Sequence, residues 1–385
     1  MRVFKLSFVD TLIDSSNLTG FIFFLITANC AVIQISYFLI AFTGPAFYKS
    51  KKNKNIMHPV SVIISARNEI ENLKKNLLLF LEQDYPDYQV VVVNDCSWDD
   101  SELFLNEMSQ KYPHLKVVTL LEQERYLHGK KFALTMGIKA SKYDCLLFSD
   151  ADCRPAGKDW IRLMQSHFSQ KTNIVLGYGA YEKRQGLLNK LIRFDTFFNA
   201  MQFLSYSLAG LPYMGVGRNL AYSKSMFFKN KGFARHQHVI SGDDDLFVNE
   251  TANASNTIIE IEPGAFTISD PEKTMPAWFR QKRRHLTTAS HYRAKHKFFL
   301  GLFSLTQFCF YAGIVFLLIY RFDYRIVVIM YASRLSVQTI IYGKNMSKLK
   351  EFDLLWLLPV YDFFIILFYV TLAISNLVSK PSKWK

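Results

Sequence analysis

Long uncharged stretches lie near both ends of the chain. Thr19 to Thr43 carries no charged residue and is longer than the apolar region of a signal peptide, so we predict a retained transmembrane anchor there. Three more apolar stretches follow late in the chain, Phe298 to Tyr320, Ile326 to Tyr342 and Leu354 to Val378. The first and last are long enough to cross a bilayer, whereas the middle one is shorter and contains Arg334, which predicts two to three C-terminal spans.

Between these stretches, short apolar runs alternate with segments whose apolar residues recur at helical spacing. Buried strands are predicted at Pro59–Ser65, Tyr88–Val93, Leu115–Leu120 and from Cys145 to the aspartates that follow it. The leucines between Leu73 and Leu81 recur at the spacing of a helix face. This alternation of strand and helix predicts an α/β fold with a doubly wound, mostly parallel sheet.

Two carboxylates, Asp150 and Asp152, end the run that begins at Cys145. In an open α/β sheet the carboxyl ends of the strands open into the ligand crevice. Hard cations prefer oxygen ligands and commonly take one or two carboxylates together with substrate phosphates. We therefore expect this pair to hold Mg²⁺ or Mn²⁺, although an ordinary polar strand end is the alternative reading of an isolated Asp-x-Asp.

Polar residues follow the other predicted strands as well. Glu69 comes after the first strand and Asp95 after the second, where an acidic side chain can accept the N–H of a nucleotide base. Lys130 follows Gly129 and supplies a cation for a diphosphate. Glu69, Asp95, Lys130 and the aspartate pair of the preceding paragraph together predict a nucleotide-binding site. Successive parallel strands end at the same edge of a sheet, so these residues are expected to lie at one edge.

The second half adds a glycine-rich turn and a run of acids. Gly215 to Asn219 reads Gly-Val-Gly-Arg-Asn, which allows backbone to approach a ligand closely, with a plain tight turn as the alternative. Asp243, Asp244 and Asp245 precede a predicted helix. One of them is explained as a helix cap, but three are not. Packed like charges raise a carboxylate pKa, which makes such an acid a better general base.

Charge and cysteine content indicate the cellular compartment and the class of partner. The formal net charge is +14, partly from the basic run between Lys49 and Lys54, which places the following segment in the cytoplasm by the positive-inside rule. No nucleic-acid-binding motif accompanies the charge, so we expect no nucleic-acid partner. The five cysteines form no disulfide framework and no metal-ligand spacing, which suits a reducing cytoplasm.

These motifs resemble the inverting family 2 glycosyltransferases of the GT-A fold, particularly the membrane-integrated branch that includes cellulose, chitin and hyaluronan synthases. The strand ending in Asn68-Glu69, the segment Asn94-Asp95-Cys96-Ser97, the sequence Gly129-Lys130 and the motif Asp150-Ala151-Asp152 carry the resemblance. It implies that Glu69 and Asp95 contact the nucleoside, Lys130 contacts the diphosphate, and the aspartates of the last motif bind the metal and the sugar nucleotide.

The resemblance also assigns the acceptor side. A glycine-rich segment similar to Gly217-Arg218 lies beneath the transferred sugar in this family, and the acid run resembles its Gly-Asp-Asp motif, whose last acid is the base. Aligned in that way the base is Asp244, whereas alignment to the variant Glu-Asp-x-Asp-Leu makes it Asp243. We favour Asp244, because Asn249 then falls five residues on.

A basic segment resembles the family's Gln-x-x-Arg-Trp motif, with Gln281 and Arg284 matched and His285 in place of the tryptophan. Arginine binds two diphosphate oxygens at once through its planar fork. The resemblance implies that Gln281 and Arg284 bind the donor and that His285 contacts the acceptor. Because the tryptophan belongs to the acceptor platform of polymerising members, its loss leaves single transfer and polymerisation both open.

The expected organisation follows from these assignments. It comprises a short N-terminal segment (1–18), an anchor (19–43), a basic linker (44–57), a GT-A domain (58–297), a C-terminal transmembrane region (298–378) and a basic tail (379–385). Interfacial helices are expected at about 186–208 and 276–296, with a core helix as the alternative for the first.

The function expected from the resemblance is that of a multi-pass enzyme of the cell (inner) membrane whose catalytic domain faces the cytoplasm. It would transfer a hexosyl or N-acetylhexosaminyl group from a nucleotide-sugar donor, expected to be UDP-linked, to a lipid-linked or glycan acceptor. A non-catalytic membrane-anchored protein that binds nucleotide sugars is the alternative, and the oligomeric state stays open.

Overall fold

The computed structural model describes residues 18–50, 57–121, 129–239 and 241–379. Several expectations concern residues outside these ranges. They are the N-terminal segment up to residue 17, residues 51–56 of the basic linker, and the basic tail beyond Ser379.

The middle of the chain forms a seven-stranded sheet in the order β3-β2-β1-β4-β8-β6-β9. Its strands are β1 (Val60–Ala66), β2 (Tyr88–Asp95), β3 (Leu115–Leu120), β4 (Cys145–Asp150), β6 (Ile174–Gly177), β8 (Leu220–Ser223) and β9 (Thr257–Glu260). The four strands predicted from the sequence pair in parallel with one another. This pairing confirms the predicted α/β class with a mostly parallel sheet.

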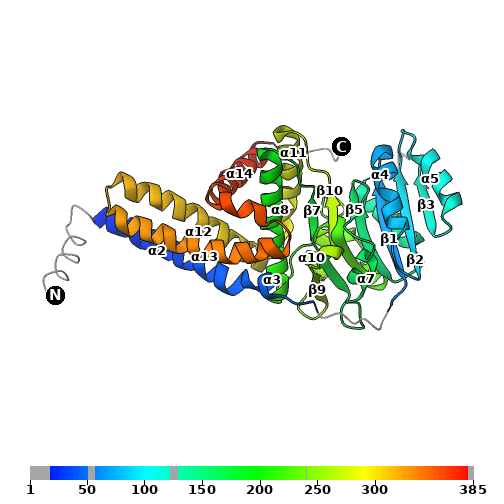
Figure 1. Ribbon diagram of the computed structural model, residues 1–385, viewed down its shortest axis with the longest axis horizontal. Helices are drawn as coiled ribbons and strands as arrows, with labels where there is room; N and C mark the ends of the chain where they lie inside the picture. Colours follow the sequence, from blue (N-terminus) through cyan, green and yellow to red (C-terminus); the bar gives the residue numbers. More distant parts are fainter. Residues whose placement is uncertain (1–17, 51–56, 122–128, 240, 380–385) are drawn as a thin grey trace.

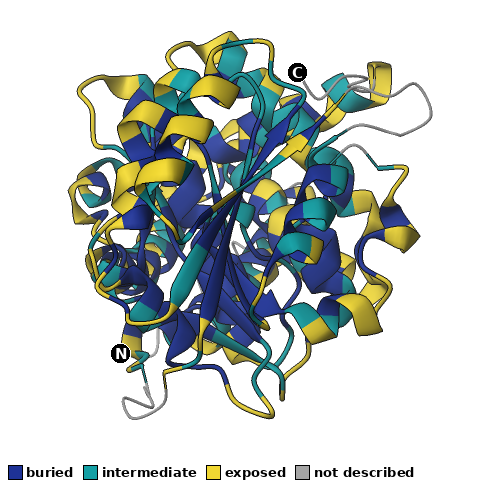
Figure 2. Cartoon of the chain, turned by 90° about the vertical axis from the view of Figure 1, so that its right-hand side faces the viewer, coloured by how far each residue is buried: buried dark blue, intermediate teal, exposed yellow. Residues whose placement is uncertain are grey.

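β-branched residues build this sheet because both of its faces are covered. In β1, Val62 packs into the core on one face and Ile63 into the core on the other, and both are fully buried. The covering helices of the α/β part are α4 (Ile70–Leu81), α5 (Ser101–Lys111), α6 (Lys130–Ala140), α7 (Trp160–Gln165), α9 (Lys224–Lys229) and α10 (Asp245–Thr251). Figure 2 shows the buried strands running between helices whose exposed residues face outward.

The strand β8 was not predicted, and it runs antiparallel to both β4 and β6. Its register pairs Leu220 with Phe148. The short helix η3 (Gly217–Asn219), which precedes β8, therefore lies beside the end of β4. A second, three-stranded sheet in the order β5-β10-β7 is formed by β5 (Cys153–Pro155), β7 (Gly179–Tyr181) and β10 (Thr267–Ser269).

Two helices join the sheet to the rest of the chain. Helix α8 (Leu187–Leu208) is buried on nearly every side, which favours a core helix over one with a face on the membrane. The segment expected as one interfacial helix over 276–296 is divided. It comprises α11 (Met275–Leu286), the short helix η6 (Thr287–His291) and the beginning of α12 (Ala294–Ile319).

Among the described residues, four helical segments are long and apolar enough to cross a membrane. The first runs over Leu18–Phe47 and contains α2 (Leu18–Ser36), a π-helical segment (Tyr37–Ala41) and α3 (Thr43–Phe47). The others are α12, α13 (Tyr324–Lys348), and η7 (Phe352–Leu357) continued by α14 (Leu358–Val378). Helices α2, α12 and α13 lie side by side and extend away from the sheet, whereas α14 lies beside α8 and α11 (Figure 1).

Arg334, the charge that made the middle apolar stretch ambiguous, lies in the centre of this helical part. Its guanidinium group is fully buried and donates hydrogen bonds to Asp362 Oδ2 and to Gln338 Oε1, each at 3.0 Å. It also donates to Gln34 Oε1 at 3.0 Å. Side chains from α2, α13 and α14 therefore meet around one charge, which explains how an arginine is accommodated in an apolar helix.

Both ends of α14 are tied to the α/β part. Before it, Glu351 forms a buried ion pair with Arg193 of α8. Midway along it, the hydroxyl of Tyr369 donates to Asp195 Oδ1 of the same helix α8 at 2.8 Å. Near its end, Arg283 of α11 donates to Asn376 Oδ1 at 3.0 Å.

Candidate active site

The carboxyl ends of the parallel strands gather the predicted residues at one edge of the sheet. Ser65 of β1 is in register with Asp150 of β4, and Ala66 is in register with Asn94 of β2. Glu69 follows β1 and Asp95 ends β2, so both lie at this edge. Asp95 is buried, whereas Glu69 is half-buried and its Oε2 accepts a hydrogen bond from Asn72 Nδ2 at 2.6 Å.

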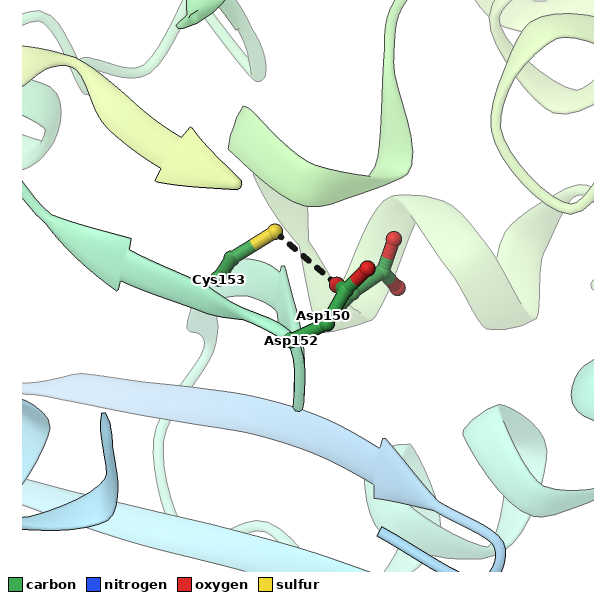
Figure 3. Close-up of side chains that lie close together, drawn as sticks. All are labelled: Asp150, Asp152 and Cys153. Atoms are coloured by element: carbon green, nitrogen blue, oxygen red, sulfur yellow. Dashed lines mark hydrogen bonds between the residues drawn. The ribbon is translucent and has the colours of Figure 1, made fainter. Parts of the chain in front are cut away.

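Asp150, Asp152 and Cys153 form a compact group whose potential ligand atoms all lie within 4.8 Å of one another (Figure 3). The thiol of Cys153 donates to Asp152 Oδ1 at 3.3 Å and lies 2.9 Å from Ser269 Oγ. Burial raises the pKa of this thiol well above its ordinary value, so the thiol stays protonated. The two carboxylates remain as the donor set, and oxygen donors fit Mg²⁺ or Mn²⁺.

Lys130 begins α6 and lies between two acids. Its Nζ is 2.8 Å from Asp150 Oδ1 and 3.2 Å from Asp243 Oδ2. Burial alone would lower the pKa of Lys130, but the charges of Asp150 and Asp243 raise it well above the ordinary value. The predicted diphosphate cation is therefore fully charged, and it faces acids from two different elements.

The same cation affects the first acid of the Asp-x-Asp motif. Burial would raise the pKa of Asp150, but Lys130, and then Arg218 and Arg284, lower it below the ordinary value. Asp150 is therefore ionised. Arg218 and Arg284 come from the glycine-rich turn and from α11, so the structure brings these predicted site residues near Asp150.

The glycine-rich turn contacts the acid run directly. The backbone N–H of Gly217 donates to Asp244 Oδ2 at 2.6 Å, and a Cβ at this glycine would lie 3.3 Å from the same oxygen. Glycine thus permits a close approach of backbone to carboxylate. The guanidinium carbon of Arg218 lies 4.3 Å from the ring centre of Tyr181, and a Cβ at Gly179 would lie 2.4 Å from Arg218 Nε. Arg218 is therefore stacked on Tyr181 in space that Gly179 leaves open.

The three consecutive acids have three different environments. Asp243 faces Lys130. Asp244 caps α10, because its Oδ1 accepts the backbone N–H of Asp245 at 2.8 Å. Asp245 accepts the hydroxyl of Tyr292 at 2.8 Å and also that of Thr288. Only one acid of the run, Asp244, therefore caps the helix, as expected from the sequence, and the other two have different partners.

The carboxyl of Asp244 has a strongly raised pKa. Burial, followed by the charges of Asp243 and Asp245, raises its pKa to about 7. Lys130 and the Gly217 N–H act in the opposite direction but do not cancel the rise. Near neutral pH this group exchanges a proton, as a general base must.

A small pocket joins several of these residues. It has a volume of about 10 Å³, which is room for about one water molecule. Its lining includes Gly217 and the charged or hydroxyl-bearing residues Lys130, Ser149, Asp150, Tyr222, Asp243 and Asp244. Glu69, Asp95, Asp152 and the residues of α11 are not part of its lining.

On α11, Gln281 and Arg284 are half-buried and His285 is exposed.

Sequence reasoning missed Lys131, Thr288 and Tyr292. Lys131 is buried, and its Nζ donates to the backbone oxygens of His236 at 2.6 Å and Val239 at 2.8 Å, just before the acid run. Its spacing of three and seven residues from Leu134 and Ile138, which are buried on α6, was the available signal. Thr288 and Tyr292 had no such signal, because they reach Asp245 from a segment more than 40 residues away.

Comparison with known proteins decides the family. Residues 22–383 match the family model of Glycosyl transferase family 21. The chain belongs to this family. The resemblance to GT-A glycosyltransferases inferred from the motifs is thereby confirmed, and family 21 is the family that the whole chain matches.

Relatives of the family 21 chain agree with this result. It is 26% identical to the probable glycosyltransferase YdaM of Bacillus subtilis over 290 residues, which is 69% of this chain and 66% of that protein. It is 29% identical to the beta-monoglucosyldiacylglycerol synthase of Synechocystis sp. over 139 residues, 36% of this chain and 27% of that protein. The chain thus covers less than two thirds of the length of each of these relatives.

Among solved structures, the family 21 chain is similar to the mannosyltransferase PcManGT from Pyrobaculum calidifontis, solved in complex with GDP-Man and Mn²⁺. The TM-score is 0.54 at 16% identity, with 88% of this chain and 99% of PcManGT covered. At this identity the likeness supports the fold, and it agrees with the GT-A expectation.

Proposed function

We propose that this family 21 glycosyltransferase transfers a hexosyl or N-acetylhexosaminyl group from a nucleotide-sugar donor to a lipid-linked or glycan acceptor. The transfer is a single displacement with inversion, and the donor is UDP-linked. The observation that carries the proposal is Asp244, a half-buried acid with a pKa of about 7 that lines one pocket with Lys130 and Asp150.

Asp244 is the general base. A single displacement needs one group to take the proton of the acceptor hydroxyl. Asp243 is paired with Lys130, and Asp245 accepts two hydroxyl hydrogen bonds, whereas Asp244 accepts hydrogen bonds from the backbone N–H groups of Gly217 and Asp245. Each carboxylate oxygen accepts two hydrogen bonds, so Asp244 retains capacity for an acceptor hydroxyl. This environment favours Asp244 over Asp243.

The residues at the strand ends and on α11 bind the donor. Glu69 and Asp95 contact the nucleoside, and Gln281 and Arg284 reach toward the diphosphate. Lys130 forms an ion pair with Asp150 and binds a phosphate oxygen of the donor. Gly217, Arg218 and His285 line the acceptor side.

Asp150 and Asp152 would hold a divalent cation, Mg²⁺ or Mn²⁺. When bound, the cation neutralises charge on the departing diphosphate. The structure of PcManGT with GDP-Man and Mn²⁺ supports this assignment and makes a GDP-linked donor the first alternative to a UDP-linked one.

A membrane setting follows from the apolar helices and from the relatives. The name of the Synechocystis relative indicates a glycolipid product, which supports lipid acceptors for this chain. We place the α/β part in the cytoplasm at the cell (inner) membrane, where activated sugars are made.

The test measures release of nucleoside diphosphate by the full chain purified in detergent. UDP-glucose, UDP-N-acetylglucosamine and GDP-mannose are each supplied with diacylglycerol micelles or with a bacterial polar lipid extract, in the presence of Mn²⁺, Mg²⁺ or a chelator. Metal-dependent release from one donor supports the proposal. Donor binding without release under every condition would contradict it and favour a non-catalytic nucleotide-sugar-binding protein.

A further inference from the structure

The third acid of the run is directed into a packed junction. Asp245 is the first residue of α10 and is buried. Its Oδ2 accepts the hydroxyl of Tyr292 at 2.8 Å and the hydroxyl of Thr288. Both partners are buried and belong to the segment that leads from α11 into α12. The Oδ2 of this buried carboxylate is thus satisfied by groups at the entrance to the apolar helices, while its Oδ1 accepts the backbone N–H of Leu246 at 2.8 Å.

One turn further along α10, Asn249 makes a second connection to the same segment. Its Oδ1 accepts the backbone N–H of Arg293 at 3.0 Å, and its Nδ2 lies 3.0 Å from His296 Nδ1. Residues at i and i+4 lie on one helix face, so Asp245 and Asn249 present one polar face of α10 to this segment.

We infer that Asp245, Thr288 and Tyr292 are positioning residues that hold α10 so that Asp244 faces the reaction pocket. The inference rests on the proposed function of Asp244 as the base. Successive helix residues are separated by about 100° around the axis, so a helix anchored through Asp245 also fixes the direction of its neighbour. The base is thereby tied to the chain segment that enters α12.

A purely structural hydrogen bond would stabilise the fold without affecting proton transfer, so the test needs a pH profile. Asp244 is surrounded by Asp243 and Asp245 from its own run, by Lys130 from α6 and by the N–H of Gly217. Asp245 in turn faces Thr288, Tyr292, Tyr213 and Lys131. Removing the charge of Asp245 removes one of the like charges next to Asp244, which facilitates ionisation of the base.

The experiment uses the full chain in detergent and whichever of the three donors above the wild type turns over. Thr288→Val and Tyr292→Phe should each lower kcat by about tenfold to a hundredfold, because small displacements of a reacting group are costly. Nucleoside diphosphate binding should stay unchanged. Thr288→Ser keeps the hydroxyl and should restore kcat, and Ser290→Ala, which removes an exposed hydroxyl in the same segment, should behave as wild type.

In the same assay, Asp245→Asn should move the acid limb of the kcat/KM profile to lower pH by about one unit. Wild-type kcat in both Thr288→Val and Tyr292→Phe would overturn the inference, and so would an unshifted acid limb in Asp245→Asn. Asp244→Asn separates the two proposals. If it is inactive while the Thr288 and Tyr292 variants equal wild type, only the positioning role fails, whereas full activity of Asp244→Asn overturns both.

Discussion

Two groups of charged side chains in the described part of the chain have differently balanced charges. Among the apolar helices, Arg334 meets one acid, Asp362, and the neutral amides of Gln34 and Gln338. At the sheet edge, Lys130 meets Asp150 and Asp243 directly and lies near Asp244. The first group is close to neutral, whereas the second has an excess of negative charge.

This difference separates a structural role from a chemical one. A buried ion pair with further hydrogen bonds holds the elements that contribute to it, and its partners have little reason to exchange protons. A buried excess of like charge raises a carboxylate pKa toward neutrality, as it does for Asp244. The comparison predicts that substitutions in the helix group affect stability and those at the sheet edge affect catalysis.

The largest expected effect is the loss of turnover in the Asp244→Asn variant. The amide cannot accept the acceptor's proton as a base does, so transfer should fall by about a thousandfold or more. Donor binding should stay within about twofold, because the substitution leaves the predicted donor residues intact. Nucleoside diphosphate release and donor binding by calorimetry check this, and near wild-type release would remove Asp244 from the base role.

The second effect is on folding. Asp362→Asn leaves Arg334 without its counter-charge in an apolar surrounding, which should lower the free energy of unfolding by about 3–5 kcal/mol. Thermal unfolding in detergent measures this change. Asp244→Asn at pH 8 is the contrasting variant and should raise the midpoint, because removing a half-buried carboxylate with an elevated pKa relieves destabilisation above that pKa. Equal unfolding midpoints in the two variants would contradict the proposed difference between the Arg334 group and the Lys130 group.

A smaller effect is expected on metal-dependent binding. Asp152→Ala removes one of the two proposed cation ligands, so binding of nucleoside diphosphate with Mn²⁺ should weaken by about tenfold to a hundredfold. Binding measured with a chelator should not change. Glu107→Ala, an exposed acid on α5, is the control for general loss of negative charge. Unaltered affinity in Asp152→Ala would exclude Asp152 from the cation site.

The smallest expected effect is the change of wild-type kcat/KM with pH. A base is active when deprotonated, so with a pKa of about 7 for Asp244, kcat/KM should fall about tenfold per pH unit below that pKa and level off above it. A profile that stays flat down to pH 5 would show that a different group, or none, takes the proton.

The sheet and the position of its ligand edge were predictable from sequence. The β-branched runs that became β1 and β2 are buried on both faces, and their consecutive valines and isoleucines indicate that burial. Because parallel strands end at one edge, Asp150 and Asp95 were expected near each other without knowledge of the register.

The separate environments of the three acids were not predictable. They depend on β8, a four-residue antiparallel strand whose register brings Gly217 to Asp244, and on Tyr292, which reaches Asp245 from beyond α11. Such contacts follow from tertiary packing and leave no periodic signal in the sequence. Cys153 is a further example, since its spacing indicated no metal site and yet its protonated thiol lies beside Asp152.

The contacts at the two ends of α14 bear on how the chain meets a bilayer. Glu351 before the helix and Tyr369 within it bind Arg193 and Asp195, which are two residues apart on α8. A bilayer crossed by α2, α12 and α13 would then leave α14 re-entrant, with Ser379 on the same side as the donor site. We expect a cysteine at position 379 to react with impermeant maleimide only from that side, and labelling from the opposite side would make α14 a full crossing.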